Sequence, residues 1–555
     1  MPVPRTLVDA LENAARADTG VWFVDGTSET FRSYAVLLQD SRRMAAALLG
    51  AGLQRGDLVA LILPDPDQFL TALFGASIAG LVPASLYPPA SVSELGPYLA
   101  QTSTILSATS ARGAVTTAAL TTSIEQVRAR CPNLAHVLTF ESLDAAPTDP
   151  TARPRLDDVA FVQFTSGSVS SPKGVAVTHA NLAANIDAIN GPAGLATTDT
   201  DVAVSWLPLS HDMGLVGMAL GALYVARPCV LMRPHLFVRR PVEWLRAIAR
   251  FRGTVSFAPN FAFDLCVRRV KEVDGLDLSS WRVAGCGAEP IHAPTLLAFA
   301  EKFAAAGFRE TALLPSYGLA EHVLAATFSP LRRPLHIDRV SRNDLLERRI
   351  AAPAHDGDAS IALVGCGRPF PGHQLEIVDE GGHVLPERHV GEIVLRGPSV
   401  MRGYYKQEAL TAETLRDGRL RTGDLGYLSE GELFVCGRAK DIIIVNGRKY
   451  HPQDLEWIVD ELSGVRRGRV AAFAVSGPGA PDRVVVVVEA SGTVAAEALT
   501  ASIRKQIADA FGVYVDDVVH VPGGTIGRTT SGKVQRAATK ARYERGEFAS
   551  TTPTL

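Results

Sequence analysis

The chain has 555 residues, of which 47% are hydrophobic and 20% charged, and its formal net charge is −3. A length well beyond ~250–300 residues predicts more than one domain, and the composition is typical of a globular protein. The charge balance gives no footprint for nucleic acid, and no apolar run approaches the ~20 residues that span a bilayer. The N-terminus lacks a signal-peptide pattern, and the six cysteines are scattered without metal or disulfide spacing. We therefore expect a soluble cytoplasmic protein.

Strand and helix patterns alternate in the first part of the chain. An apolar run at 57–63 stops at Pro64, a helical pattern covers 68–79, and a second apolar run covers 81–86. The same alternation recurs at 160–190 and 254–291. Units of this β–α–β kind predict a parallel sheet with helices on both faces.

The pattern changes from about residue 360. Short glycine-bearing strands predict an antiparallel, barrel-like region; they lie at 374–378, 391–395 and 431–435. A small terminal unit follows, with a helix, a strand and a second helix predicted at 452–462, 483–488 and 495–511. We expect an α/β protein with a large N-terminal domain (1–437) of parallel α/β sheets plus a small β-barrel-like subdomain. A short segment (438–441) connects it to a small, mobile α+β C-terminal domain (442–555). The charged segment 329–360 is poor in strand pattern and is predicted to be an insertion or a mobile loop.

A polar loop interrupts two strand-like runs between residues 161 and 177. It is rich in small and hydroxylic residues and ends in Lys173 followed by a glycine. Such loops wrap backbone N–H groups and hydroxyls around phosphates, although a polar surface hairpin is the alternative. It is not a Walker A loop, because Gly-Lys-Ser/Thr is absent. Its candidate nucleotide-binding residues are Thr165, Ser166, Gly167, Ser168 and Lys173. The run resembles the phosphate loop of the acyl-adenylate-forming (AMP-binding) enzymes, with Ser170 at a position where fatty acyl-AMP ligases commonly depart from the usual glycine.

A second motif, Ser-His-Asp-Met-Gly at 210–214, resembles the fatty acyl-AMP ligases specifically. The resemblance implies a catalytic role for His211, whereas Asp212 is interpreted as mainly structural, at a helix start. Met213, Gly214, Asn260 and Phe261 become candidate substrate-pocket residues, with Asn260 also able to cap the helix that follows it. For each aromatic residue, ordinary core packing remains an equal alternative.

Three further segments carry the adenosine motifs of the family. Small residues at a strand end let a flat ring lie against the backbone, as at Gly287, Ala288 and Glu289. The resemblance implies that Ser316, Tyr317 and Gly318 border the adenine ring, that Asp424 binds both ribose hydroxyls, and that Arg438 reaches the ribose or phosphates. The resemblance also implies that Glu321, with Thr165, is a Mg²⁺ ligand. Physical chemistry agrees, because a carboxylate beside a triphosphate needs a hard cation between them.

The segment 527–536 resembles the family motif P-x-T-x-S-G-K-x-x-R, with Gly527 in place of the proline. The resemblance implies that Lys533 approaches the attacking carboxylate and the α-phosphate. It also implies that Lys440 is the hinge about which the small domain swivels between its two catalytic orientations.

The resemblance implies a two-step reaction with ATP and Mg²⁺ as cofactors. A fatty or related carboxylic acid forms acyl-AMP and pyrophosphate, and the acyl group then passes to an acyl carrier protein in trans, often of a polyketide or peptide synthase. The insertion would restrain the small domain and disfavour free CoA. An acyl-CoA synthetase is the first alternative. A non-catalytic nucleotide-binding relative is the second, against which the presence of Glu321, Asp424 and Lys533 counts.

Overall fold

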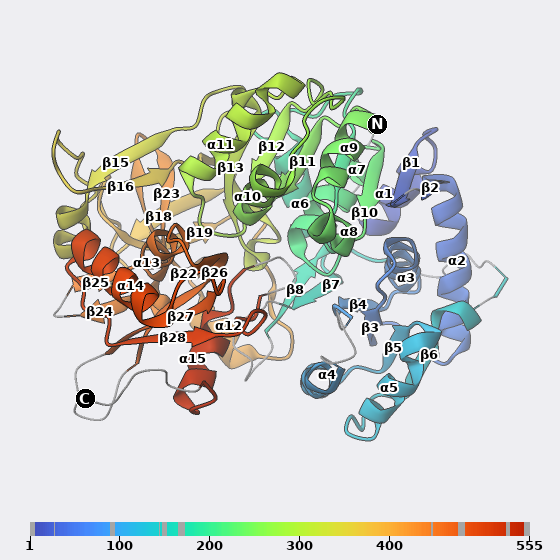
Figure 1. Cartoon of the computed structure of the whole chain (residues 1–555). Helices are drawn as coiled ribbons and strands as arrows, with labels where there is room; N and C mark the ends of the chain where they lie inside the picture. The colour runs from blue at the N-terminus through green and yellow to red at the C-terminus, as the bar shows by residue number, and fades with distance from the viewer. Residues whose placement is uncertain are drawn as a thin grey trace.

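The computed structural model describes residues 6–26, 28–88, 95–143, 145–146, 153–164, 173–445, 448–475, 483–528 and 533–548. Within these ranges, two large sheets and an antiparallel sheet precede a smaller C-terminal unit, which lies beside the antiparallel sheet in Figure 1. No described helix is both long and apolar enough to cross a membrane.

A seven-stranded sheet has the order β20-β8-β7-β4-β3-β5-β6. β3 to β7 run parallel to one another. β8 pairs antiparallel with β7, and β20 pairs antiparallel with β8, so β20 again runs in the direction of β7. The strands are β3 (Leu58–Ile62), β4 (Val82–Ser85), β5 (Gly113–Thr116), β6 (His136–Thr139), β7 (Val159–Phe164), β8 (Gly174–Thr178) and β20 (Gly403–Tyr404). The main helices around this sheet are α2 (Tyr34–Gly50), α3 (Pro66–Ile78), α4 (Leu95–Thr109) and α5 (Ala118–Arg128).

Burial of β3 on both faces explains why its sequence shows no alternation of apolar and polar residues. Val59 and Leu61 belong to the core that includes α2 and α3. Leu58, Ala60 and Ile62 belong to a second core with α4 and α5. Both faces of the sheet are therefore covered, as the parallel β–α–β pattern predicts.

A nine-stranded sheet has the order β17-β14-β13-β12-β11-β9-β10-β1-β2. From β1 to β13 the neighbouring strands along this path pair in parallel. The strands are β1 (Gly20–Asp25), β2 (Ser28–Ser33), β9 (Ala203–Ser205), β10 (Cys229–Met232), β11 (Val255–Ala258), β12 (Val283–Cys286), β13 (Leu313–Gly318), β14 (Ala325–Phe328) and β17 (Arg368–Pro369). Its helices include α1 (Leu7–Ala14), α6 (His179–Asn190), α7 (Gly221–Tyr224), α8 (Pro234–Arg239), α9 (Val242–Phe251), α10 (Asn260–Arg269) and α11 (Ala293–Phe303).

The third sheet is antiparallel and corresponds to the predicted barrel-like region. It contains β18 (Gln374–Val378), β19 (Gly391–Arg396), β21 (Leu415–Arg416), β22 (Arg419–Ser429) and β23 (Glu432–Arg438), with α12 (Glu408–Thr414) nearby in the chain. The segment 329–360 has more order than its sequence pattern indicates. It contains β15 (Ile337–Ser341), paired with β16 (Ser360–Val364), and the short π-helix η7 (Asp344–Arg348).

The C-terminal unit has its own three-stranded sheet, β26 (Val465–Val475), β27 (Arg483–Ala490) and β28 (Asp517–Val521). Around it lie α13 (Pro452–Asp460), α14 (Ala496–Phe511), α15 (Arg536–Glu544) and the small hairpin of β24 (Ile443–Val445) and β25 (Arg448–Tyr450). Alternate valines of β27 face two separate cores. This mixed architecture confirms the predicted α+β character of the C-terminal domain.

Candidate functional site

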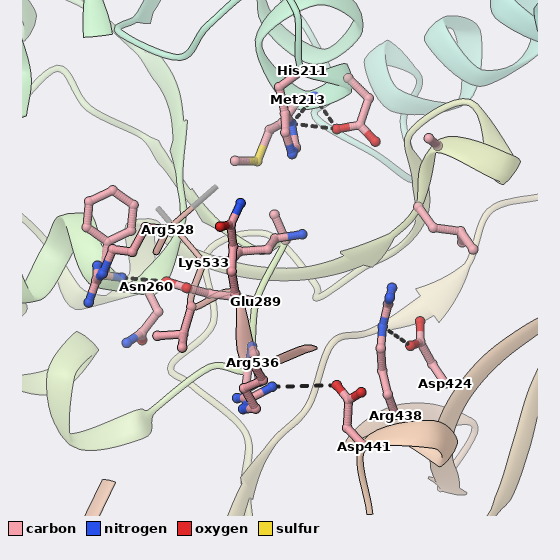
Figure 2. A pocket seen from close by; sticks show the side chains of 18 of the residues that line it. His211, Met213, Asn260, Glu289, Asp424, Arg438, Asp441, Arg528, Lys533 and Arg536 are labelled. Atoms are coloured by element: carbon pink, nitrogen blue, oxygen red, sulfur yellow. Dashed lines mark hydrogen bonds and ion pairs between the residues drawn. The ribbon is translucent and has the colours of Figure 1, made fainter. Parts of the chain in front are cut away.

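A cavity of about 2590 Å³ lies between the large sheets and the C-terminal unit. The predicted site residues that line it come from segments far apart in the chain: Lys173, His211, Met213, Asn260, Phe261, Ala288, Glu289, Ser316, Tyr317, Gly318, Glu321, Asp424, Arg438, Lys440 and Lys533. Figure 2 shows that several of them point toward one another across the cavity. Thr165, Ser166, Gly167 and Ser168 lie outside the described residues.

The ends of β12 and β13 form one wall of the cavity. Ser316 Oγ donates a hydrogen bond to the carbonyl oxygen of Cys286 at 3.1 Å. A Cβ at Gly287 would lie only 2.6 Å from Ser316 Oγ, so glycine permits this close approach. Ala288 has a φ of 70°, a left-handed conformation that costs free energy in a residue other than glycine. Close backbone approach and strain at one strand end are typical of a ligand-binding edge.

Asp424 is the centre of a second wall. The Tyr317 hydroxyl donates to its Oδ2 at 2.9 Å, and Arg438 Nε lies 2.9 Å from its Oδ1. Burial, with Asp424 beside it, raises the pKa of Tyr317 well above its usual range. Asp424 likewise raises the pKa of Arg438. Three residues that motifs predicted separately therefore form one hydrogen-bonded group.

Tyr404, a residue that the motifs did not predict, lies between Glu321 and Lys173. The Tyr404 hydroxyl donates to Glu321 Oε1 at 2.8 Å, and Lys173 Nζ lies 5.2 Å from the centroid of the Tyr404 ring. β20 brings Tyr404 here by pairing with β8, which begins directly after Lys173. A tyrosine more than two hundred residues beyond the lysine carries no local signal that could have identified it.

The His211 motif begins an unusual helix. Asp212 lies at a helix start, as predicted, and residues Met213–Leu220 form a π-helix, η3. Single π turns are rare and are frequent at functional sites. Asp212 Oδ1 accepts from the Met213 N–H at 2.7 Å and lies 2.7 Å from His211 Nδ1. Gly214 lies behind the lining, where a Cβ would approach the carbonyl oxygen of Pro208 to 2.4 Å.

Asp212 is more than a helix-capping residue. Burial opposes its ionisation, but His211 and Lys533 outweigh that effect and leave its pKa below the usual range. Burial lowers the pKa of Lys533, an effect that Asp212, Glu289 and Asp424 oppose. The lysine from the C-terminal unit therefore lies in the field of three carboxylates of the large domain.

The prediction that Asn260 caps its own helix is wrong. Asn260 is the first residue inside α10, and its Oδ1 accepts from the His292 N–H at 3.1 Å. The carboxylate of Glu289 serves the helix start, because its Oε1 accepts from the Phe261 N–H at 2.7 Å. Pro259, at the N-cap, has no side-chain acceptor for the free N–H groups of this helix start. Glu289, which follows strand β12, accepts from one of them instead.

An apolar stretch of the wall lies next to η3. Gly217 is the only residue of η3 that is not buried, and it lines the cavity. The apolar residues Ile189, Phe257, Leu324 and Phe328 line the same cavity. A Cβ at Gly217 would lie 2.8 Å from Leu324 Cδ2, so glycine keeps this stretch open.

Comparison with known proteins identifies the family of this chain. Residues 11–405 match the family model of the AMP-binding enzymes, and residues 440–552 match that of the AMP domain of Disco-interacting protein 2-like proteins. A putative acyl-CoA synthetase of Caulobacter vibrioides is 38% identical over 98% of this chain and 96% of its own. A medium-chain-fatty-acid–[acyl-carrier-protein] ligase, JamA, of Moorena producens is 34% identical over 92% of this chain and 89% of its own.

A solved structure has nearly the same fold. It comes from work on fatty acyl-adenylate ligases of E. coli and L. pneumophila, and it superposes with a TM-score of 0.92. The two sequences are 37% identical, and the match covers 98% of each chain. Both the large and the small units are therefore arranged as in that structure.

Proposed function

Because this chain belongs to the fatty acyl-AMP ligases within the AMP-binding enzyme family, we propose that it activates a fatty or related carboxylic acid with ATP and transfers the acyl group to an acyl carrier protein in trans. The observation that supports this most is the position of Lys533, which enters a cavity whose other walls carry Tyr317, Asp424 and Glu321. Two anionic reactants need cationic groups at the reacting centre.

Adenosine fits the group formed by Tyr317, Asp424 and Arg438. The Asp424 carboxylate has acceptor capacity for ribose hydroxyls, and Tyr317 and Arg438 hold it in place at 2.9 Å each. Ala288, Ser316 and Gly318 line the cavity and would border the adenine ring. Gly287 and Gly318 allow the close packing behind this edge, because a Cβ there would meet Ser316 Oγ or the carbonyl oxygen of Leu324. Lys173, together with the loop before it, approaches the phosphates.

Glu321 suits a magnesium ion held jointly with phosphate oxygens. No cluster of three or more metal-binding side chains occurs among the described residues. Mg²⁺ in nucleotide sites typically takes one or two carboxylates plus phosphates, which one glutamate can provide. The ion would neutralise charge on the phosphates, and Thr165 is the second proposed ligand.

In the first half-reaction, an oxygen of the substrate carboxylate attacks the α-phosphorus of ATP. The bond from that phosphorus to the bridging oxygen breaks, and pyrophosphate leaves with the electron pair. Lys533 stabilises the charge at the reacting centre, and His211, oriented by Asp212, lies beside the carboxylate. The acyl chain would extend along Met213 and the apolar wall near Gly217, in the cavity that Asn260 and Phe261 also line. Gly214 would act from behind this wall, through the close packing that it allows against Pro208.

In the second half-reaction, the phosphopantetheine thiol attacks the acyl carbon of the mixed anhydride, and AMP leaves. We propose that the small domain (442–555) swivels at residues 438–441, around Lys440, to admit the thiol. The name of JamA, a relative that uses a carrier protein, supports a carrier as acceptor. Six unpaired buried cysteines suit the reducing cytoplasm.

Contacts of the insertion with the small domain also support a carrier over free CoA. Arg342 donates to the carbonyl oxygen of Ala510, and its guanidinium lies 4.8 Å from the Phe511 ring centroid. Glu347 and Arg448 form an ion pair at 2.6 Å. These contacts oppose the rotation of the small domain that the second half-reaction needs. A carrier protein can offset this cost with the free energy of its own binding to the enzyme, whereas free CoA has a smaller contact surface, so the carrier is the better acceptor.

The name of the Caulobacter relative keeps an acyl-CoA synthetase as the second candidate. The test is pyrophosphate exchange into ATP over a panel of acids, followed by CoA and a holo-carrier protein offered in parallel. Acid-dependent exchange with thioester formed only on the carrier supports the proposal. Exchange with efficient CoA acylation favours the second candidate, and no exchange with any acid refutes both.

A further inference from the structure

Arg528 connects the segment that carries Lys533 to the large domain. Its guanidinium carbon lies 5.7 Å from the centroid of the Phe261 ring, at the start of α10. Its Nη2 also donates to the carbonyl oxygen of Gly468 in the small domain's own sheet. In Figure 2, Arg528, Asn260, Glu289 and Lys533 lie in one group. The arginine therefore bridges the two domains directly beside the reacting centre.

The segments that carry Arg528 and Lys533 pair with each other. Arg528 pairs with Val534 in an isolated antiparallel bridge, and the Gln535 N–H donates to the carbonyl oxygen of Gly527 at 2.9 Å. Lys533 directly precedes Val534 in the chain. A shift of Arg528 therefore moves the backbone that carries Lys533.

The surface under Arg528 is held rigidly. Edge-on contacts join the Phe261 ring to Trp206, at a centroid distance of 6.0 Å, and to Phe237, at 6.5 Å. The Phe261 N–H is bound to the Glu289 carboxylate. Packing from three sides leaves this ring little freedom, so it provides a fixed reference point.

Electrostatics make this contact specific to the present domain orientation. Burial lowers the pKa of Arg528, and Arg469 adds to the effect, while Glu289 opposes it. Burial also raises the pKa of Glu289, which Arg528 and Lys533 counteract. The buried charges of Arg528 and Glu289 compensate each other only in the domain orientation that places Lys533 in the cavity. Swivelling would separate them.

We propose that Arg528 is a positioning residue that holds the segment beginning at Lys533 against Phe261 and Glu289 for acyl-adenylate formation. This rests on the proposed function and adds a determinant of its first half-reaction. Misplacing a catalytic group by about 1 Å can cost on the order of 10²-fold in rate. Figure 2 shows Arg528 and Asp424 at opposite sides of the view, with Lys533 and Glu289 between them, so nucleotide binding should be spared.

The test is Arg528→Ala in the full chain. We expect kcat of ATP–pyrophosphate exchange to fall on the order of 10²-fold with the KM for ATP within about twofold of wild type. Thioester formation from supplied acyl-AMP should remain unchanged. Arg528→Lys keeps a cation over the ring and should recover most of the exchange rate. Phe261→Leu should mimic the alanine variant, and the double variant should be less than additive.

Arg504→Ala is the matched control. Arg504 makes the same types of contact, 5.8 Å from the Tyr514 ring centroid and to the carbonyl oxygens of Val515 and Asp516, but within the small domain alone. It should exchange at the wild-type rate. Thermal melting of all variants reports whether any loss reflects unfolding.

Trp457 provides a readout that is independent of activity. It is the only tryptophan after residue 441, and its ring lies 4.7 Å from that of His292 in the large domain. Arg528→Ala should change its emission without nucleotide, and Arg504→Ala should not. Equal loss of both half-reactions, a raised KM with unchanged kcat, or equal behaviour of the two variants would overturn the inference. If wild type itself exchanges no pyrophosphate, the proposed function fails instead.

Discussion

Replacing Gly217 by leucine should shorten the acids that the enzyme accepts. The new side chain would enter the cavity, because a Cβ at this position already lies 2.8 Å from Leu324 Cδ2. The far end of Leu324 can turn aside for a single methyl group but not for a whole isobutyl group. Glycine inside a helix is unfavourable, so folding should not suffer from the lost glycine itself.

The magnitude follows from the burial of methylene groups. Each CH₂ removed from water contributes about 0.8 kcal/mol, which is about fourfold in kcat/KM. A leucine side chain that displaces about three methylenes should therefore cost about 2.4 kcal/mol, or about 60-fold, for acids long enough to reach it. Shorter acids should be unaffected.

The assay is pyrophosphate exchange with acids from hexanoic to hexadecanoic, compared by kcat/KM. Gly50→Ala is a control, since a Cβ there at the end of α2 would have no neighbour within 4 Å. A loss of equal size for every acid, or no loss for any, would refute the placement of the acyl chain along η3.

Four further changes test the site and the fold. Lys533→Ala should slow pyrophosphate exchange on the order of 10²–10³-fold and spare thioester formation from supplied acyl-AMP; equal loss in both would reject this division. Asp424→Asn should raise the KM for ATP about tenfold by weakening a charged hydrogen bond, as steady-state kinetics would show, with little change in the KM for the acid. Arg342→Ala should increase acylation of CoA about fivefold, because one restraint of roughly 1 kcal/mol on the small domain is lost; an unchanged preference for the carrier would argue against the restraint. Burial lowers the pKa of His179 to about 4, and its Nδ1 accepts from the Leu7 N–H at 3.2 Å. Below about pH 6.5 His179 is protonated in the unfolded chain but stays neutral in the folded chain down to about pH 4. The free energy of unfolding should therefore fall as the pH is lowered from about 6.5 to 4, and the melting temperature of His179→Gln should depend less on pH.

Local patterns predicted several elements of the fold correctly. The helix predicted at 68–79 is α3 (Pro66–Ile78), with Asp65 accepting from the Asp67 N–H at its start. The strand predicted at 57–63 is β3 (Leu58–Ile62), which is buried throughout. These elements depend on periodicity and on end signals within a few residues, so the sequence alone contains the information.

Exceptions occur where a distant segment replaces a local partner. At the start of α10, the Phe261 N–H is bound by the carboxylate of Glu289, which follows a strand of another β–α unit. The side chain of Asn260 accepts from His292 and does not cap the helix. The apolar run after Asp212 forms a π-helix, although its composition is compatible with an ordinary helix. Neither outcome has a signature within the segment itself.

The sequence by itself determined the α/β class, the order of the motifs and the residue types available for adenylate chemistry, because each depends on neighbours along the chain. Only the tertiary structure decided which of them meet. Tyr317 bonds Asp424 across 107 residues, and Tyr404 bonds Glu321 across 83. Arg528 reaches Phe261 from another domain. Contacts of this separation arise from how sheets and domains pack, which no local pattern encodes.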